Sequence, residues 1–152
     1  MNHHKDSQKR NEEKHREKSP AFQIKPEDMK DYNHLVETAR KFGERLERNK
    51  VKSSQFRRVF THIKKIQISM ESKGYGKDKR MPDDIFKEVL LLKPKIAYTA
   101  GRHENIRDFY DVMVQFVNAI ETVGDFNRFY DFVEASLAYH KYYGEIKDKK
   151  RQ

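Results

Sequence analysis

The sequence predicts an all-α fold, a single compact bundle of five to six helices that follows a disordered, charged N-terminal arm. Apolar residues recur at intervals of three and four in one stretch after another, which is the period of a helix buried on one face. Almost no stretch alternates apolar and polar residues as a strand does. The 152 residues fit one domain with tails, and we expect an arm over 1–26, a helical domain over 27–144 and a basic tail over 145–152.

Two helices are predicted in the first half of the chain. The first covers about residues 28–48, where Leu35, Ala39, Phe42 and Leu46 follow a spacing of four and three. Ser53 or Ser54 is the expected N-cap of a second helix that extends to Met70. The apolar stripe of this second helix consists of Phe56, Val59, Phe60, Ile63, Ile66 and Met70. Gly74 and Gly76 lie in a charged run and predict the longest internal loop, at about 71–81.

Further helices are predicted in the second half. Pro82 precedes a helix so rich in apolar residues that we expect it to be the most buried element. Pro94 predicts a kink or a restart, and Gly101 is expected to end the following short helix in the left-handed conformation. A helix over about 105–123 is expected to end at Gly124. A last helix, capped by Asp125, places His140 on its apolar face as a packed core residue and is expected to stop at Gly144, before a frayed tail.

Composition narrows the classes of function. There is no cysteine, so disulfides, thiolate metal sites and thiol nucleophiles are absent. The histidines are scattered without metal-ligand spacing, and we expect neither a metal nor a cofactor. No apolar run approaches the about 18 residues of a membrane span, and the charged residues 1–19 contain no signal-peptide core. We therefore expect a cytoplasmic protein that does not contact membranes.

Basic residues are concentrated in one window. Between Arg48 and Met70 there is no acidic residue, although the whole chain balances 33 Lys and Arg against 24 Asp and Glu. Unopposed cations bind phosphate backbones by neutralising charge and releasing counterions. Ser54 adds a hydroxyl and a backbone N–H group at a helix N-terminus, which favours phosphate. The predicted RNA-binding residues of this window are Lys50, Lys52, Ser54, Arg57, Arg58, Lys64 and Lys65.

Two later segments add candidate residues. Lys93, Lys95 and Arg102 bracket a short element that contains small residues, and Lys141 lies among tyrosines near the end of the last helix. Each feature alone is also typical of ordinary packing and of a solvated helix face. Residues 103–134 carry seven acidic and two basic side chains, and we expect this region to pack against other subunits.

Three segments, in this order and spacing, resemble the small all-helical subunit of type III-A CRISPR interference complexes, the Csm complexes. They are Ser53-Ser54-Gln55-Phe56-Arg57-Arg58, Lys95-Ile96-Ala97-Tyr98-Thr99-Ala100-Gly101-Arg102, and the stretch from Phe132 to Gly144 that ends Ala138-Tyr139-His140-Lys141-Tyr142-Tyr143-Gly144. The resemblance covers about residues 33–144. It implies a non-catalytic subunit that lines the groove holding crRNA and target RNA through sequence-independent backbone contacts. It also implies other Csm subunits as partners, with stacked copies in the complex and self-association as a dimer in isolation. Residues 52–58 and Arg102 are the implied RNA contacts, followed by Lys141.

Two alternatives remain open from the residues. A helical ribonuclease of the HEPN kind carries an Arg and a His with four to six residues between them, a pattern that Arg57 and His62 satisfy. The His would act as general base on a 2′-hydroxyl while the Arg stabilises the phosphorane. The pattern is short, because Arg10 and His15 satisfy it as well. A helix-turn-helix regulator would instead read DNA bases with the second helix and bind one sequence preferentially.

Overall fold

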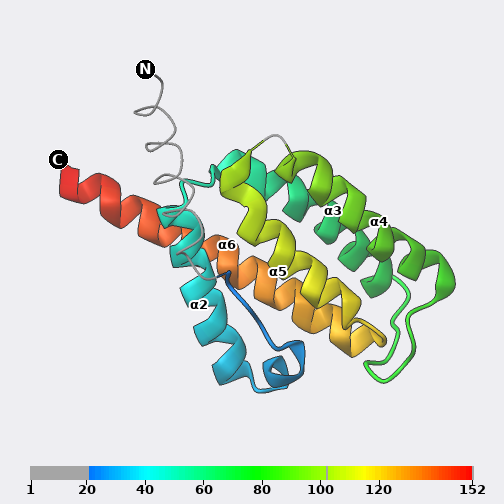
Figure 1. Ribbon diagram of the computed structural model, residues 1–152. Helices are drawn as coiled ribbons and strands as arrows, with labels where there is room; N and C mark the ends of the chain where they lie inside the picture. Colours follow the sequence, from blue (N-terminus) through cyan, green and yellow to red (C-terminus); the bar gives the residue numbers. More distant parts are fainter. Residues whose placement is uncertain (1–20, 102, 152) are drawn as a thin grey trace.

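The computed structural model describes residues 21–101 and 103–151, which form an all-α bundle (Figure 1). The α-helices of this part of the chain are α2 (Tyr32–Arg48), α3 (Ser53–Glu71), α4 (Asp83–Ala100), α5 (Arg107–Asn118) and α6 (Val123–Arg151). Two short 3-10 turns, η1 (Pro26–Lys30) and η2 (Glu104–Ile106), precede α2 and α5. The all-α prediction and the predicted number of helices are confirmed. Within the described residues, no helix is long and apolar enough to span a bilayer.

The core is aromatic and is centred on the long helix α6. Figure 1 shows α3 and α4 side by side at one side of the bundle, α2 at the other, and the last turns of α6 extending beyond the body. Phe42 of α2 stacks between Phe109 of α5 and Phe132 of α6, with ring centroids 6.3 and 5.7 Å away. All three rings are fully buried. One continuous core therefore joins helices from both halves of the chain.

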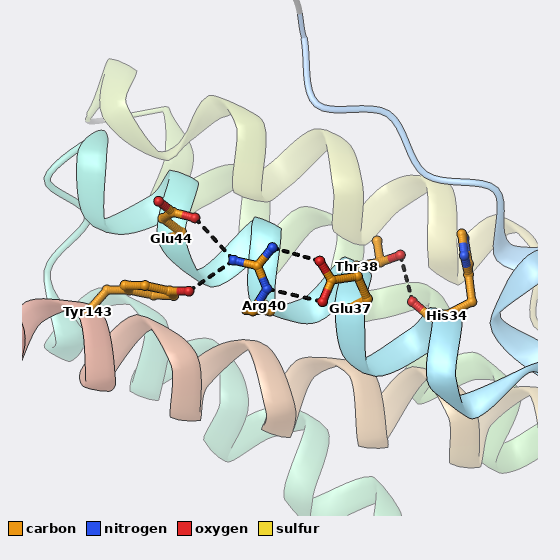
Figure 2. Close-up of polar contacts among 6 residues, drawn as sticks. All are labelled: His34, Glu37, Thr38, Arg40, Glu44 and Tyr143. Carbon is orange, nitrogen blue, oxygen red and sulfur yellow. Dashed lines mark hydrogen bonds and ion pairs between the residues drawn. The ribbon is translucent and has the colours of Figure 1, made fainter.

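Helix α2 makes its most extensive contact with α6, and a glycine permits it. A Cβ atom built on Gly43 would lie 2.7 Å from the Ser136 carbonyl oxygen and 2.8 Å from the His140 backbone nitrogen. At the rim of the same contact, Arg40 donates to the Tyr143 hydroxyl over 3.0 Å and pairs with Glu37 and Glu44 of its own helix (Figure 2). The backbones of the two helices thus approach closely at Gly43, and the hydrogen bond from Arg40 to Tyr143 joins the helices at the rim of this contact.

Helix α4 differs from the prediction in three respects. It continues through Pro94, so the predicted restart and the separate short helix are wrong, while a kink at Pro94 stays a prediction. Because proline has no N–H group, the Leu90 carbonyl loses its helical hydrogen bond. Both Pro94 and Leu90 are exposed, so water can donate a hydrogen bond to this carbonyl instead. Gly101 has φ −62°, so the predicted left-handed end is wrong. The prediction that this helix is the most buried is also wrong, since Leu90 and Leu91 are 41% and 44% exposed, whereas α5 buries five of its twelve residues.

The boundary between α5 and α6 also differs from the prediction. Helix α5 ends at Asn118 rather than near residue 123, because the chain turns there to leave Thr122 at the start of α6. The Thr122 hydroxyl accepts from the Asp125 N–H over 3.2 Å, and the Asp125 carboxylate accepts from the Thr122 N–H over 3.0 Å. Thr122 is therefore the N-cap, and Asp125 completes a reciprocal capping pair. Gly124 lies in the first turn of α6, where its N–H donates to the Lys77 carbonyl over 2.8 Å.

The predicted ends of the domain need correction. Gly144 does not stop α6, which continues to Arg151, so residues 145–151 are helical rather than frayed. Gly144 instead accommodates Glu47 of α2, whose carboxylate oxygen would lie 3.2 Å from an added Cβ atom. At the other end, Phe22 packs 5.2 Å from Phe42, so the packed domain begins before residue 27. The predicted disorder of residues 1–20 concerns a segment outside the described residues.

The predicted internal loop is present between α3 and α4. An isolated antiparallel bridge joins Arg80 to Thr122. The Met81 N–H donates to the Glu121 carbonyl over 3.0 Å, and the Val123 N–H donates to the Lys79 carbonyl over 2.8 Å. These bonds fix the charged loop against the connection between α5 and α6.

Candidate nucleic-acid interface

The acid-free window begins at a tight connection between α2 and α3. Lys50 has φ 60°, the left-handed conformation that glycine usually supplies at a helix end. The Lys50 N–H donates to the Glu47 carbonyl and the Val51 N–H to the Leu46 carbonyl, each over 3.0 Å, which is the hydrogen-bond pattern of a Schellman motif. Lys50 thus ends α2 in a strained conformation, and its side chain is exposed.

Two side chains from distant elements hold this connection in place. Buried His140 of α6 lies with its Nε2 atom 2.7 Å from the Val51 carbonyl oxygen, so this nitrogen carries the proton and donates. Asn105 of η2 donates from Nδ2 to the Lys50 carbonyl over 2.9 Å. The prediction that His140 is a packed core residue is confirmed. The position of Lys50 is therefore determined by α6 and η2 as well as by α2.

The N-cap of helix α3 lies one residue before Ser53, the first of the two predicted caps. Lys52 is the N-cap, and the Lys52 N–H donates to the Gln55 side-chain oxygen over 3.0 Å. Ser53 and Ser54 are the first two helical residues, whose N–H groups have no acceptor within an α-helix. The first turn of α3 contains no acidic residue. This helix start therefore offers an anion exposed N–H dipoles beside the Lys52 ammonium group.

Helices α3 and α4 form two adjacent hollows. The first, which we call the Lys95 hollow, has a volume of about 320 Å³ and is lined by Arg58, Val59, His62, Leu92, Pro94, Lys95, Ile96, Tyr98 and Thr99. The second, the Ser54 hollow, has a volume of about 290 Å³ and is lined by Lys52, Ser54, Gln55, Arg58, Tyr98, Thr99, His103 and Asn105. Arg58, Tyr98 and Thr99 line both hollows. The first two predicted segments therefore meet at one surface.

The third predicted segment reaches the same surface from the other side. A hollow of about 480 Å³, which we call the Lys141 hollow, is lined by Glu47, Lys50, Val51, Lys52, Ser53, His140, Lys141, Gly144, Glu145 and Asp148. Lys52 also lines the Ser54 hollow, so the three hollows are consecutive. Glu47, Glu145 and Asp148 make the Lys141 end less positive than the rest. We call the surface formed by Lys50, Lys52, Ser54, Arg58, Lys95 and Lys141 the basic face.

Four other predicted residues do not line these hollows. Arg57 and Lys64 are seven residues apart and share a flank of α3 that lies about 100° around the helix from Arg58. Lys65 is exposed one turn beyond His62 and adds to the positive field there. Lys93 is half-buried and also lies outside the three hollows. Arg102, predicted to be a main RNA contact, lies outside the described residues.

The sequence reasoning assigned no role to Tyr98, which occupies the centre of the basic face. Its side chain is 65% exposed, more than any other large apolar side chain of the described residues. The only available signal was its position in the segment Lys95–Arg102, where periodicity assigned it to neither the apolar stripe nor the charged side.

Burial, followed by the charges of Lys95 and Lys65, lowers the pKa of His62, which lines the Lys95 hollow. This histidine is therefore neutral at pH 7 and does not repel the cations around it.

Arg57 and His62, the pair that satisfies the HEPN pattern, do not line the same hollow. Arg57 and His62 are five residues apart, which places them about 140° apart around α3, and only His62 lines the Lys95 hollow. The arginine on the same side as His62 is Arg58. Among the described residues, no three histidine or carboxylate side chains are placed to hold a metal ion.

Several acidic residues of the 103–134 region have partners within the chain. Asp108 accepts from Arg45 Nε over 2.8 Å and from Asn49 Nδ2 over 3.0 Å, which ties α5 to the end of α2. Asp131 accepts from the Tyr32 hydroxyl over 2.7 Å, and burial together with this bond raises the pKa of Tyr32 to about 12. These carboxylates stabilise the fold. The assignment of the acidic region to subunit packing stays a prediction.

Comparison with known proteins identifies a family. The model of the family described as Csm2 Type III-A matches residues 29–146 of this chain. The matched range contains the basic face and all five described helices except the last turn of α6. Searches of curated proteins and of solved structures give no significant match.

Proposed function

We propose that the basic face of this chain, which belongs to the Csm2 Type III-A family, binds RNA. Membership of the family makes the chain a small subunit of the type III-A CRISPR effector, whose other Csm subunits are its partners. The face lines the groove that holds the crRNA–target RNA duplex, and its contacts go to the sugar-phosphate backbone. The subunit is non-catalytic, takes no cofactor and acts in antiviral defence in the cytoplasm. Copies of the chain also associate with one another.

The convergence of three distant segments on one face is the observation that carries this proposal. Lys52 and Ser54 at the start of α3, Arg58 one turn later, Lys95 of α4 and Lys141 of α6 border consecutive hollows. A single charged helix keeps any bundle soluble, but cations gathered from three helices around a helix N-terminus match a chain of phosphates. Backbone recognition is what an effector needs when its guide sequence varies.

The proposal is tested by salt-dependent RNA binding of the full chain. Arg58→Ala should weaken binding of a guide–target duplex to a similar degree for unrelated sequences, and should lower the slope of log K against log salt by about 1. Lys41→Ala removes an equal charge from an exposed position on α2 outside the three hollows and serves as the control. Equal affinity of wild type and Arg58→Ala at every salt concentration contradicts the proposal. Strong preference for one DNA sequence would favour the helix-turn-helix alternative instead.

The non-catalytic assignment has its own test. Labelled single-stranded and duplex RNA should remain intact during long incubation with the purified chain. His62 is the residue that a HEPN-like ribonuclease would use as its base, so His62→Ala is the informative variant. Cleavage by the wild type that His62→Ala abolishes would establish the enzymatic alternative.

A further inference from the structure

A further hollow lies at the end of the bundle opposite the last turns of α6 (Figure 1). It has a volume of about 820 Å³, larger than any of the three hollows of the basic face, and we call it the tyrosine pocket. Met70 in its lining follows Ser54 by sixteen residues on α3, about 24 Å along the helix axis, so the pocket is separate from the basic face. The lining residues come from α2, α3, α6 and the loop after α3, and they are Tyr32, Gln67, Met70, Glu71, Gly74, Tyr75, Val123, Asn127, Tyr130 and Asp131.

The tyrosine pocket is acidic, although the chain as a whole carries a net charge of +9. Glu71 and Asp131 supply two carboxylates, and none of the lining residues that the structure describes is Lys, Arg or His. The last turn of α3 ends here with its partial negative charge and contains no basic residue to offset it. The positive ends of α2 and α6 lie at the same end of the bundle, but the carboxylates of Asp31 and Asp125 cap them. The pocket therefore favours a positively charged group.

Three tyrosines give the pocket aromatic walls, and such walls also suit a cation. Tyr32 is 49% exposed, and its hydroxyl donates to the Asp131 carboxylate over 2.7 Å, so a ring and a carboxylate are held side by side. At Tyr75, the Nζ atom of Lys79 lies 4.6 Å from the ring centroid. The chain's own lysine thus already makes a cation–π contact with one of these walls.

We propose that the tyrosine pocket receives an arginine side chain presented by a different protein. A guanidinium group is planar, so it can lie flat on a tyrosine ring while it donates hydrogen bonds in its own plane to carboxylates. Tyr32 and Asp131 offer this combination, and the Glu71 carboxylate adds a second acceptor. RNA would be repelled from these carboxylates, so the inference goes beyond the proposed function and does not depend on it. Asp131 belongs to the acidic region 103–134 that we expect to contact other subunits.

The first measurement uses short peptides as probes of the pocket. The full-length, isotope-labelled chain is titrated with acetyl-Gly-Arg-Gly-amide and followed by NMR. Two further peptides carry lysine or citrulline in place of arginine, and citrulline keeps the planar shape of arginine without its charge. The arginine peptide should shift the amide signals of Gly74 and Asn127, which line the pocket, and leave that of Ser54 unchanged. The lysine peptide should bind about threefold more weakly, and the citrulline peptide should cause no shift.

Variants of the chain separate charge from ring. Glu71→Gln and Asp131→Asn should each weaken binding of the arginine peptide by about three- to fivefold, which is the scale of an exposed ion pair. Tyr32→Leu should cause a similar loss because it removes the cation–π contact, whereas Tyr32→Phe keeps the ring and should bind as the wild type does. Glu88→Gln removes an equal charge from an exposed position on α4 outside the pocket and serves as the control. Circular dichroism verifies that each variant retains its helices.

The second measurement tests whether a protein supplies the arginine. The double variant Glu71→Gln/Asp131→Asn, co-expressed with the other Csm subunits, should be recovered in the assembled complex in about fivefold smaller amounts than Glu88→Gln. Peptide binding with undiminished recovery would overturn the assignment of a partner protein. If sedimentation shows instead that the double variant disrupts self-association of the chain, a second copy occupies the pocket and the inference is wrong.

The peptides can also overturn the inference directly. Equal binding of the arginine and lysine peptides would mean that charge alone is recognised. Absence of shifts at Gly74 and Asn127, or shifts that Glu71→Gln and Asp131→Asn leave unaltered, would mean that the pocket is not the binding site. None of these results bears on RNA binding by the basic face, which the Arg58→Ala titration tests separately.

Discussion

Replacing Gly43 by alanine should destabilise the bundle by separating its two most extensively packed helices. A Cβ atom at this position would lie 2.7 Å from the Ser136 carbonyl oxygen, 2.8 Å from the His140 backbone nitrogen and 2.8 Å from the Tyr139 Cβ atom. Two of these three atoms belong to the backbone of α6 and cannot rotate away. Relief to an ordinary contact of about 3.5 Å requires α2 and α6 to move apart by several tenths of an ångström.

The magnitude follows from two opposing effects. Overfilling a well-packed contact costs about 1–3 kcal/mol. Alanine is a better helix former than glycine by about 1 kcal/mol, which offsets part of this cost. Since the clash here is with backbone, we expect the upper part of the range and a net loss of about 1–2 kcal/mol. For a domain of this size, such a loss lowers the melting temperature by roughly 3–8 °C.

Thermal and urea denaturation followed by circular dichroism measure this loss. Gly101→Ala is the matched control, because its Cβ atom would approach only the Ala97 carbonyl oxygen, at 3.2 Å, and because φ of −62° suits alanine. We expect Gly101→Ala to be as stable as the wild type or slightly more stable. An unchanged melting temperature for Gly43→Ala, or equal destabilisation by the two substitutions, would refute the reasoning.

Three further changes test the fold, at Lys50, His62 and Asp125. Lys50→Gly should raise the free energy of unfolding by about 0.5–1 kcal/mol because it relieves the left-handed conformation, whereas Lys50→Ala should not, although both weaken RNA binding equally in a titration. The pKa of His62 is lower in the folded chain than in the unfolded one, so the wild type should lose stability as the pH falls below about 6.5. His62→Gln should reduce this loss in urea melts at several pH values. Burial acts to raise the pKa of Asp125, but hydrogen bonds from the Thr122 and Glu121 N–H groups and the Thr122 hydroxyl, together with the charge of Arg128, lower it overall. The contribution of Asp125 to the free energy of unfolding is therefore present above pH 3.8 and disappears as the pH falls through the folded-state pKa. Asp125→Asn should therefore cost about 1 kcal/mol in urea melts at pH 7 and less in strong acid.

The presence of a helix was predictable wherever the sequence contains an apolar stripe of helical period. The position of a helix end was not predictable where it depended on a single glycine. Gly124 and Gly144 were interpreted as helix ends, but both lie inside α6. They are glycines because other parts of the chain pass close to them, the Lys77 carbonyl in one case and the Glu47 carboxylate in the other. A sequence shows that a residue is small, whereas the segment that needs the space is known only after folding. Gly43 gave no signal for the same reason.

The candidate site was predictable in composition but not in geometry. The acid-free window located the cations on α3, where Arg57 and Arg58 lie about 100° apart around the helix. Which of the two flanks faces the rest of the binding surface depends on where α4 packs, and that is determined by long-range contacts. The close approach of Lys141 to Lys52 likewise depends on the contact between α2 and α6. Tyr98 was missed because an exposed aromatic residue follows no periodic rule.

The hydrogen bonds at the base of the site explain why distant packing matters for it. His140 and Asn105 hold the carbonyl groups of Val51 and Lys50, so the backbone that carries Lys50 and Lys52 is fixed to α6 and η2 rather than to α3 alone. His140 reaches Val51 only because α2 and α6 are in close contact, and Gly43 permits that contact. Surface cations on a slack loop would gain affinity from charge but lose it again to the entropy of ordering the loop on binding. Here the fold has ordered the loop in advance, so the basic face is preorganised for the RNA binding that we propose.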